Sequence, residues 1–420
     1  MENYNPEKYL KQKGIVEDDN WYYLPFDNDF AYECGWKFYI PISPVYANEI
    51  LNKILPILYN SNIPFKYAKN ERQLGKINSG AAGWTQIGKN IVFYMPVLKK
   101  ETLIKILKEL YELNIEYPNV HHANQLVVNA PLYYRFGNYT KKENFEDDRY
   151  AFDRKKIEST FINNVASEIG SINFSENYSE KLNSFLLSYP PIDVLSQSGK
   201  GGVFKCLDLK ELNYTEAVLK VGYYLGAQQK NGVDGAKLLH NEILVTELIA
   251  ESSPKFKIPK IINMYASRKS IAVVYELING TSGLKLLLED DLSTNDIISC
   301  INSIKELHDI GIIWGDAKIG NVIFHDVERM SLYLIDFENS YKVGAQPITH
   351  MRTFEIKDLP QNIDNKSRDI IEFLVSILFD IEHDSQSNTS ISNLLLRGYK
   401  METKQFAREY LVNYLNKLKI

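Results

Sequence analysis

The chain has 420 residues, of which 45% are hydrophobic and 24% are charged, which is ordinary for a globular protein of two or three domains. Its formal net charge is −5, and no segment carries a helical stripe of Lys and Arg, so a nucleic-acid partner is not expected. No apolar run reaches transmembrane length and the N-terminus lacks an apolar signal core, so we expect a cytoplasmic protein without a membrane partner.

The three cysteines Cys34, Cys206 and Cys300 are far apart in the sequence and form no C-x-x-C pair. This spacing argues against a disulfide framework and predicts reduced, mostly buried thiols.

The first part of the chain predicts an α+β arrangement. Short apolar runs predict strands, and two segments with apolar residues at helical spacing predict amphipathic helices. The expected strands cover 36–42, 63–68, 90–96 and 130–136, and the expected helices cover 43–61 and 99–114.

A boundary is expected within residues 186–195, where Pro190 and Pro191 stop any helix and an alternating apolar strand follows. The second part then shows a strand, a glycine-rich turn, two further strands and a helix. From about residue 285 it is predicted to be helical, apart from one hairpin.

The glycine-rich turn lies in "SQSGKGGVFKCLDL" (196–209), which contains Gly199, Gly201 and Gly202. Glycines allow backbone amides to approach phosphates closely, and Val203 would then cover a nucleotide base. A glycine-rich hairpin is also common as a simple turn, so this motif has weight only in combination with others.

Lys220 lies in the apolar strand 216–224, and the helix 236–250 that follows contains Glu242 and Glu247. A lysine that binds the α- and β-phosphates needs a helical glutamate to hold it. We favour Glu242 because apolar residues flank it on the helix, and Glu247 is the alternative. The segment 271–287 resembles the strand and hinge that hold adenine, near Glu276 and Leu277.

The most informative motif is "IIWGDAKIGNVIF", followed after a short hairpin by "LYLIDFE". Asp316 is placed to orient an attacking hydroxyl, whereas Asn321 and Asp336 are placed to hold Mg²⁺ on nucleotide phosphates. Lys318 could neutralise the phosphoryl group during transfer. In this order and spacing, the motifs resemble the catalytic loop and metal-binding motif of protein kinases, which implies ATP or GTP and Mg²⁺ as cofactors.

Two departures from the kinase pattern stand out. Trp314 and Gly315 replace the usual His-Arg, so no partner for a phosphorylated activation loop is expected. Glu338 replaces the glycine of the usual Asp-Phe-Gly. Asp369, in the expected helix 364–379, either braces the catalytic loop or complements the dipole at a helix N-terminus.

The first part carries a different signature in "GWKFYI" (35–40), "IPFKYAKNERQL" (63–74), "GKNIVFYMP" (88–96) and "PLYYRFGNY" (131–139). These segments resemble the N-terminal lyase domain of class III and class IV lanthipeptide synthetases, which is similar to the bacterial phosphothreonine lyases. The segments 225–248 and 334–338 resemble the kinase part of the same synthetases. The resemblance covers most of residues 20–380.

This resemblance implies an enzyme with two activities, a Ser/Thr peptide kinase and a phospho-Ser/Thr lyase that leaves dehydroalanine or dehydrobutyrine. Lys66 matches the base that removes the Cα proton, and Lys37 and Arg135 match phosphate ligands. Lys89 and Arg72 are further candidates for phosphate binding. The implied partner is a precursor peptide with leader and core regions.

Tyr39 is the main departure in the first part, because the family has a histidine there that protonates the leaving phosphate. Tyr39 could donate a proton, or the lyase is inactive. The alternative function is therefore a Ser/Thr kinase whose front domain only docks the precursor.

These inferences divide the chain into a lyase-like domain (1–188) and a kinase-like domain (189–420), whose lobes meet near residue 280. Because no cyclase domain follows, we expect either a separate cyclase partner or a truncated chain. The sequence leaves the oligomeric state open, including a homodimer.

Overall fold

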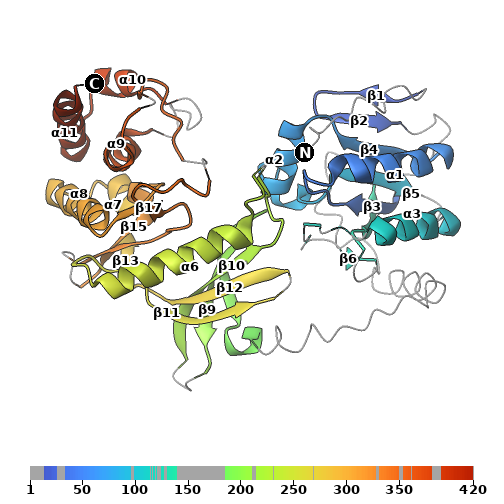
Figure 1. Cartoon of the computed structure of the whole chain (residues 1–420), viewed down its shortest axis with the longest axis horizontal. Helices are drawn as coiled ribbons and strands as arrows, with labels where there is room; N and C mark the ends of the chain where they lie inside the picture. The colour runs from blue at the N-terminus through green and yellow to red at the C-terminus, as the bar shows by residue number, and fades with distance from the viewer. Residues whose placement is uncertain are drawn as a thin grey trace.

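The computed structural model describes residues 14–25, 34–95, 99–113, 115, 117–118, 120, 124–126, 130–139, 185–210, 214–229, 231–267, 269–327, 331–349, 353–360, 362–380 and 389–419. The expected domain 1–188 therefore lies partly outside the described residues. Mixed helices and antiparallel sheets make up the fold, which is compatible with the predicted α+β class (Figure 1).

The front part of the chain is built around a seven-stranded antiparallel sheet with the strand order β1-β2-β4-β5-β3-β7-β6. Its strands are β1 (Val16–Glu17), β2 (Trp21–Leu24), β3 (Cys34–Ile40), β4 (Phe65–Ala68), β5 (Ile91–Met95), β6 (Asn124–Gln125) and β7 (Tyr133–Asn138). Its helices are α1 (Ala47–Asn60), α2 (Glu71–Ser79), the short 3₁₀ turn η2 (Trp84–Gln86) and α3 (Lys100–Leu113).

One face of this sheet packs on helices, and the core lies between them. Phe38, Phe65 and Phe93 from the sheet share a buried cluster with Leu51 of α1 and Leu107 of α3. Because side chains alternate along a strand, the residues next to these point to the opposite face. That opposite face carries the charged residues described below.

The predicted helix 43–61 begins later than expected. Helix α1 starts at Ala47, after a turn in which the backbone N–H of Tyr46 donates to the carbonyl of Ser43 at 3.1 Å. Its predicted apolar face is confirmed, because the following residues are fully buried: Ile50, Leu51, Ile54, Leu55 and Leu58.

A five-stranded antiparallel sheet with the order β11-β12-β10-β9-β8 follows the double proline. It consists of β8 (Pro191–Ser198), β9 (Gly201–Asp208), β10 (Thr215–Tyr223), β11 (Ile261–Ala266) and β12 (Ser270–Glu276), with helix α6 (Gly235–Ser252) between β10 and β11. Helix α6 packs on one face through Leu239 and Ile243, which form a cluster with Val273 and Tyr275 of β12. Strand, turn, two strands and helix follow one another as predicted.

The last part is mainly helical, again as predicted, with a hairpin between α8 and α9. Its helices are α7 (Gly283–Leu288), α8 (Thr294–Asp309), η4 (Ile319–Asn321), α9 (Asn365–Leu378), α10 (Ile391–Leu396) and α11 (Glu402–Leu418). Its strands are β13 (Gly280–Ser282), β14 (Ile312–Ile313), β15 (Val322–His325), β16 (Leu332–Leu334) and β17 (Tyr341–Lys342).

Among the described residues, no helix is long and apolar enough to cross a membrane. Cys206 and Cys300 are free, buried thiols, as predicted.

Candidate active site

A pocket opens between the glycine-rich turn, strand β10 and helix α6. Its lining includes Gly201, Gly202 and Val203 of β9, together with Lys220 and Glu242. Lys220 lies directly opposite Val203 in the β9–β10 register, so both side chains stand on the same face of the sheet. The pocket therefore has glycine backbone that a ligand can approach closely and the ammonium group of Lys220, and phosphate binding requires both.

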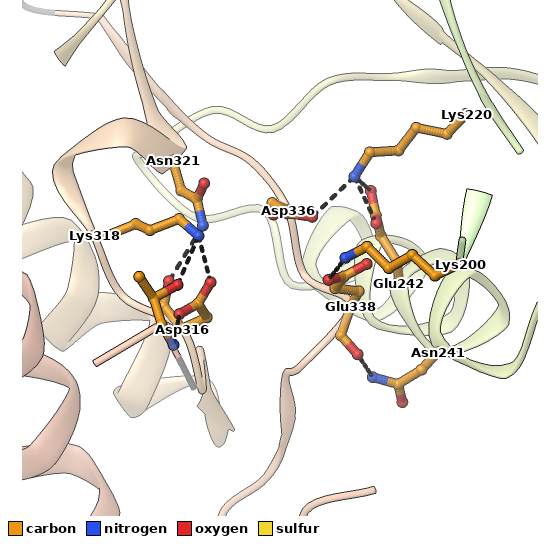
Figure 2. A network of polar contacts seen from close by, with 10 residues as sticks. Lys200, Lys220, Asn241, Glu242, Asp316, Lys318, Asn321, Asp336 and Glu338 are labelled. Atoms are coloured by element: carbon orange, nitrogen blue, oxygen red, sulfur yellow. Dashed lines mark hydrogen bonds and ion pairs between the residues drawn. The ribbon is translucent and has the colours of Figure 1, made fainter. Parts of the chain in front are cut away.

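Lys220 is held by two carboxylates from distant parts of the chain (Figure 2). Its Nζ donates to Glu242 Oε1 at 2.9 Å, to Glu242 Oε2 at 2.8 Å and to Asp336 Oδ1 at 3.0 Å. Glu242 is buried, whereas Glu247, the alternative partner, is exposed on the same helix. The contact therefore favours Glu242 over Glu247.

The charges of Lys220 and Asp336 stabilise each other, whereas burial raises the pKa of Glu242. Burial alone would raise the pKa of Asp336, but the ammonium groups of Lys220, Lys200 and Lys318 outweigh it and hold that pKa below its ordinary value. Burial would lower the pKa of Lys220, yet Asp336 and Glu242 raise it well above the ordinary lysine value. Both groups are therefore charged at neutral pH.

Asp316 follows a tight bend at Gly315, which has a φ of 81°. A Cβ at Gly315 would lie 2.2 Å from the carbonyl oxygen of Asn339, so only glycine fits there. The Asp316 carboxylate accepts from Lys318 Nζ at 2.6 Å and from the backbone N–H of Thr353 at 3.0 Å. These two donors fix its orientation.

Lys318 and Asn321 surround the same aspartate (Figure 2). Lys318 Nζ also donates to Thr353 Oγ1 at 2.9 Å, and the Asn321 side-chain nitrogen donates to the Asp316 carbonyl at 3.2 Å. Asp316, Lys318 and Asn321 thus lie together on one loop, and Asp336 follows a residue that contacts it, since the backbone N–H of Ile335 donates to the carbonyl of Asn321 at 3.0 Å. Thr353 was not predicted, and nothing in its local sequence indicates this contact.

Asp369 braces this loop from helix α9. Its carboxylate is fully buried and accepts from the backbone N–H of Trp314 at 2.8 Å and of Gly315 at 3.1 Å. His308 Nε2 lies 3.0 Å from the same group. Of the two readings of Asp369 from the sequence, the loop brace is the one that the contacts bear out.

Glu338 occupies the place of the usual glycine and contacts Lys200 of the glycine-rich turn (Figure 2). Asn241 of α6 donates to the backbone carbonyls of Glu338 at 3.1 Å and of Ser340 at 2.8 Å. The sequence showed Glu338 as a departure from the kinase pattern, but it did not predict Lys200 as its partner.

The oxygen donors in this network suit a divalent metal ion. One carboxylate oxygen each of Glu242, Asp336 and Glu338 lie within 4.8 Å of one another. Carboxylate and amide oxygens are the ligands that Mg²⁺ and Ca²⁺ prefer. The three carboxylates that lie close enough together to hold a metal ion are therefore Glu242, Asp336 and Glu338, and magnesium binding by Asn321 and Asp336 stays a prediction.

Glu276 and Leu277, expected to hold adenine, lie at the end of β12. The backbone N–H of Glu276 donates to the carbonyl of Lys260 at 2.9 Å, so this N–H already has a hydrogen-bond partner in the residue just before β11. Neither residue lines the pocket described above. An adenine contact by these two residues stays a prediction.

The face of the front sheet that points away from the helices gathers the residues expected to bind phosphate. Lys37 of β3 pairs directly with Arg135 of β7, and Tyr39 pairs with Val92 of β5. Lys66 of β4 also pairs with Val92. Because directly paired residues point to the same side, the side chains of Lys37, Tyr39, Lys66 and Arg135 share one face.

Lys66 is a partly buried lysine on this face. Its Nζ lies 4.2 Å from the ring centroid of Trp21 on the neighbouring strand β2. Burial lowers the pKa of Lys66, although the carboxylate of Asp18 partly opposes that shift. A lowered pKa makes the neutral amine, the form that accepts a proton, more accessible near neutral pH.

Tyr39 is almost completely buried in an apolar cluster with Val92, Val120 and Tyr133. Lys89 Nζ lies 5.2 Å from the Tyr39 ring centroid, which places Lys89 beside this face. Arg72 is different: it is exposed on α2, and no described contact brings it to Lys37, Lys66 or Arg135. The structure thus groups four of the five predicted cations.

Residues 3–164 match the family model described as "RamC, N-terminal domain". No curated protein matches the chain. RamC is a lanthipeptide synthetase of class III/IV type, so the match is consistent with a lanthipeptide-synthetase-like protein. The front part of this chain is thus similar to the N-terminal domain of RamC, which indicates an enzymatic function related to lanthipeptide biosynthesis.

Proposed function

We propose that the chain is a peptide dehydratase of lanthipeptide biosynthesis that first phosphorylates Ser or Thr of a precursor peptide and then eliminates the phosphate. The observation that carries the proposal is the convergence of Lys220, Glu242 and Asp336 beside the loop of Asp316 and Asn321. The match of residues 3–164 to the RamC N-terminal domain supports the second step.

In the phosphorylation step, the peptide hydroxyl oxygen attacks the γ-phosphorus of ATP or GTP, and the bond from that phosphorus to the β-phosphate oxygen breaks. Asp316 accepts the hydroxyl proton, and the Lys318 ammonium 2.6 Å from its carboxylate stabilises charge on the phosphoryl oxygens. Lys220, held by Glu242, binds the α- and β-phosphates. Asn321 and Asp336 would hold Mg²⁺, which neutralises phosphate charge when bound.

In the elimination step, the neutral amine of Lys66 removes the Cα proton of the phosphorylated residue. The electron pair forms the Cα–Cβ double bond, and the Cβ–O bond breaks to release phosphate. Lys37 and Arg135, paired across β3 and β7, bind the leaving phosphate, and Lys89 lies close enough to the same face to assist. The product is dehydroalanine or dehydrobutyrine.

A second candidate keeps the kinase and treats the front part as a docking module for the precursor. The burial of Tyr39 favours it, because only 1% of this residue is exposed and a proton donor must be reprotonated from solvent. Phosphate leaves without an acid when cations stabilise its charge, so the geometry of Lys37, Lys66 and Arg135 favours the two-step function.

The test is mass spectrometry of a Ser/Thr-containing precursor peptide incubated with the full chain, Mg²⁺ and ATP or GTP. Loss of water from the peptide supports the dehydratase. Stable gain of phosphate supports the kinase with a docking module, and an unmodified peptide contradicts both.

A further inference from the structure

The front part of the chain touches the glycine-rich turn directly. The backbone N–H of Gly199 donates to the carbonyl of Ser79, the last residue of α2, at 3.0 Å. A Cβ at Gly199 would lie 1.6 Å from the carbonyl oxygen of Asn78. The end of α2 and the turn are therefore in backbone contact, and Figure 1 shows α2 beside the loops that precede α6.

A second contact joins the front part to the segment between β10 and α6. Ser43, which is fully buried, donates its hydroxyl to Gln228 Oε1. Two residues earlier, Gly226 lies against the glycine-rich turn, since a Cβ there would be 2.5 Å from the carbonyl oxygen of Gly199. The segment that contacts Ser43 therefore also contacts the same turn.

The segment that carries Gln228 also reaches the part of the chain next to Asp316. Thr349 Oγ1 donates to Gln229 Oε1 at 3.0 Å, and the Asn231 side chain donates to the carbonyl of Ile348 at 3.1 Å. Four residues after Thr349, the backbone N–H of Thr353 donates to Asp316. The segment that contacts Ser43 therefore also contacts Ile348 and Thr349, which precede Thr353 in the sequence.

We infer that the front part positions the nucleotide-binding loop of the kinase-like part, so that nucleotide affinity depends on the Ser43–Gln228 contact. This inference rests on the proposed function of the pocket. A glycine-rich turn has many conformations, and ordering it on binding costs conformational entropy. A turn already held by Ser79 and Gly226 binds phosphate with less of that cost.

This support also explains how the kinase-like part works with Trp314 and Gly315 in place of His-Arg. In the usual kinase pattern, an arginine and a phosphorylated residue would order the segment that contains Ile348 and Thr349. In this chain, Gln229 and Asn231 hold that segment instead. The two reactions are then coupled through structure, since the domain that eliminates phosphate also supports the loop that binds the nucleotide.

The experiment is a double-mutant cycle on the full chain with Ser43→Ala, Gln228→Ala and the double variant. Gln228→Glu keeps the acceptor oxygen, and Gly75→Ala on α2 is the control, because a Cβ there meets nothing within 4 Å. Equilibrium dialysis measures the affinity for ATP with Mg²⁺. Elimination from a synthetic phosphoserine peptide reports on the front site.

We expect each single variant to weaken ATP binding about 2- to 10-fold, the usual effect of one hydrogen bond, and the double variant to be no weaker than either. Gln228→Glu and Gly75→Ala should bind like the wild type, and elimination should be unchanged in all. Hydrogen exchange at residues 196–202 should rise only in the weakened variants.

Wild-type affinity in the single variants, or additive losses in the double variant, would overturn the inference while leaving the proposed function intact. A wild-type chain that binds neither ATP nor GTP would instead overturn the proposed function, and this inference with it.

Discussion

At the scale of single residues, Asp316 is the group on which the proposed phosphorylation depends most. In the variant Asp316→Asn, we expect phosphorylation to fall about 10²- to 10⁴-fold, the usual contribution of a general base, while ATP affinity stays near that of the wild type. Phosphopeptide formation and equilibrium dialysis measure the two effects. Asp309→Asn, an exposed site at the end of α8, is the matched control. Equal activity of both variants would remove Asp316 from this role.

Lys66 has the corresponding role in the proposed elimination. The variant Lys66→Ala should accumulate phosphopeptide, because phosphorylation continues while the Cα proton is no longer removed. Mass spectrometry distinguishes the phosphopeptide from the dehydrated product. Lys105→Ala, an exposed lysine of α3, should dehydrate the peptide like the wild type. Normal dehydration by Lys66→Ala would show that another group is the base.

The pH dependence of elimination follows from the same residue. Burial lowers the pKa of Lys66, and only the neutral amine accepts a proton. The rate of elimination from a phosphoserine peptide should therefore rise with pH and level off above an apparent pKa lower than the ordinary lysine value of about 10.4. A rate that falls as pH rises through this range would contradict a lysine base.

At the scale of elements, α9 supports the loop that carries Asp316. In Asp369→Asn, one carboxylate oxygen is replaced by an NH₂ group that cannot accept, so the N–H group of either Trp314 or Gly315 loses its acceptor. We expect the free energy of unfolding to fall by about 1–3 kcal/mol, the cost of unsatisfied buried groups, together with reduced phosphorylation. Urea unfolding and phosphopeptide formation measure these effects. Unchanged stability and activity would show that the brace is not required.

The strand pair β3–β7 places Lys37 and Arg135, the proposed phosphate ligands, side by side. Lys37→Ala and Arg135→Ala should each raise the KM for a phosphoserine peptide about tenfold, because a charge-assisted hydrogen bond is lost. Steady-state elimination kinetics on the isolated second step test this, with Lys105→Ala again as control. Wild-type KM values in both variants would place the phosphate elsewhere.

At the same scale, the sequence predicted α1, α3 and α6 and the strands β3, β4 and β5 because apolar spacing and proline positions are local signals, whereas α2, β1, β2 and β6 were not predicted. The start of α1 was misplaced because Pro44 and Ser43 form a turn whose continuation as helix depends on tertiary contacts. The sequence named Lys37 and Arg135 separately. Their direct pairing could not be predicted, because it depends on the strand register of the folded sheet. Arg72 was grouped with them by resemblance alone, and it lies exposed on α2.

At the scale of the whole molecule, the contacts between the front part and the glycine-rich turn were beyond sequence reasoning. Gly199 and Ser79 meet through their backbones, which carry no side-chain signature, and Ser43 and Gln228 are 185 positions apart. The Lys220–Glu242 pair could be predicted from the sequence because a known motif relates the two residues. The Lys200–Glu338 pair could not be predicted, because Glu338 stands where the motif departs from the usual pattern.

The central claim is that one chain adds phosphate to a peptide and then removes it as a leaving group. A time course by mass spectrometry, with precursor, Mg²⁺ and ATP or GTP, tests it most directly. We predict that phosphopeptide appears first and is replaced by a peptide lighter by water, and that Lys66→Ala stops at the phosphopeptide. A wild-type reaction that ends at stable phosphopeptide, or a water loss that needs no nucleotide, would contradict the claim.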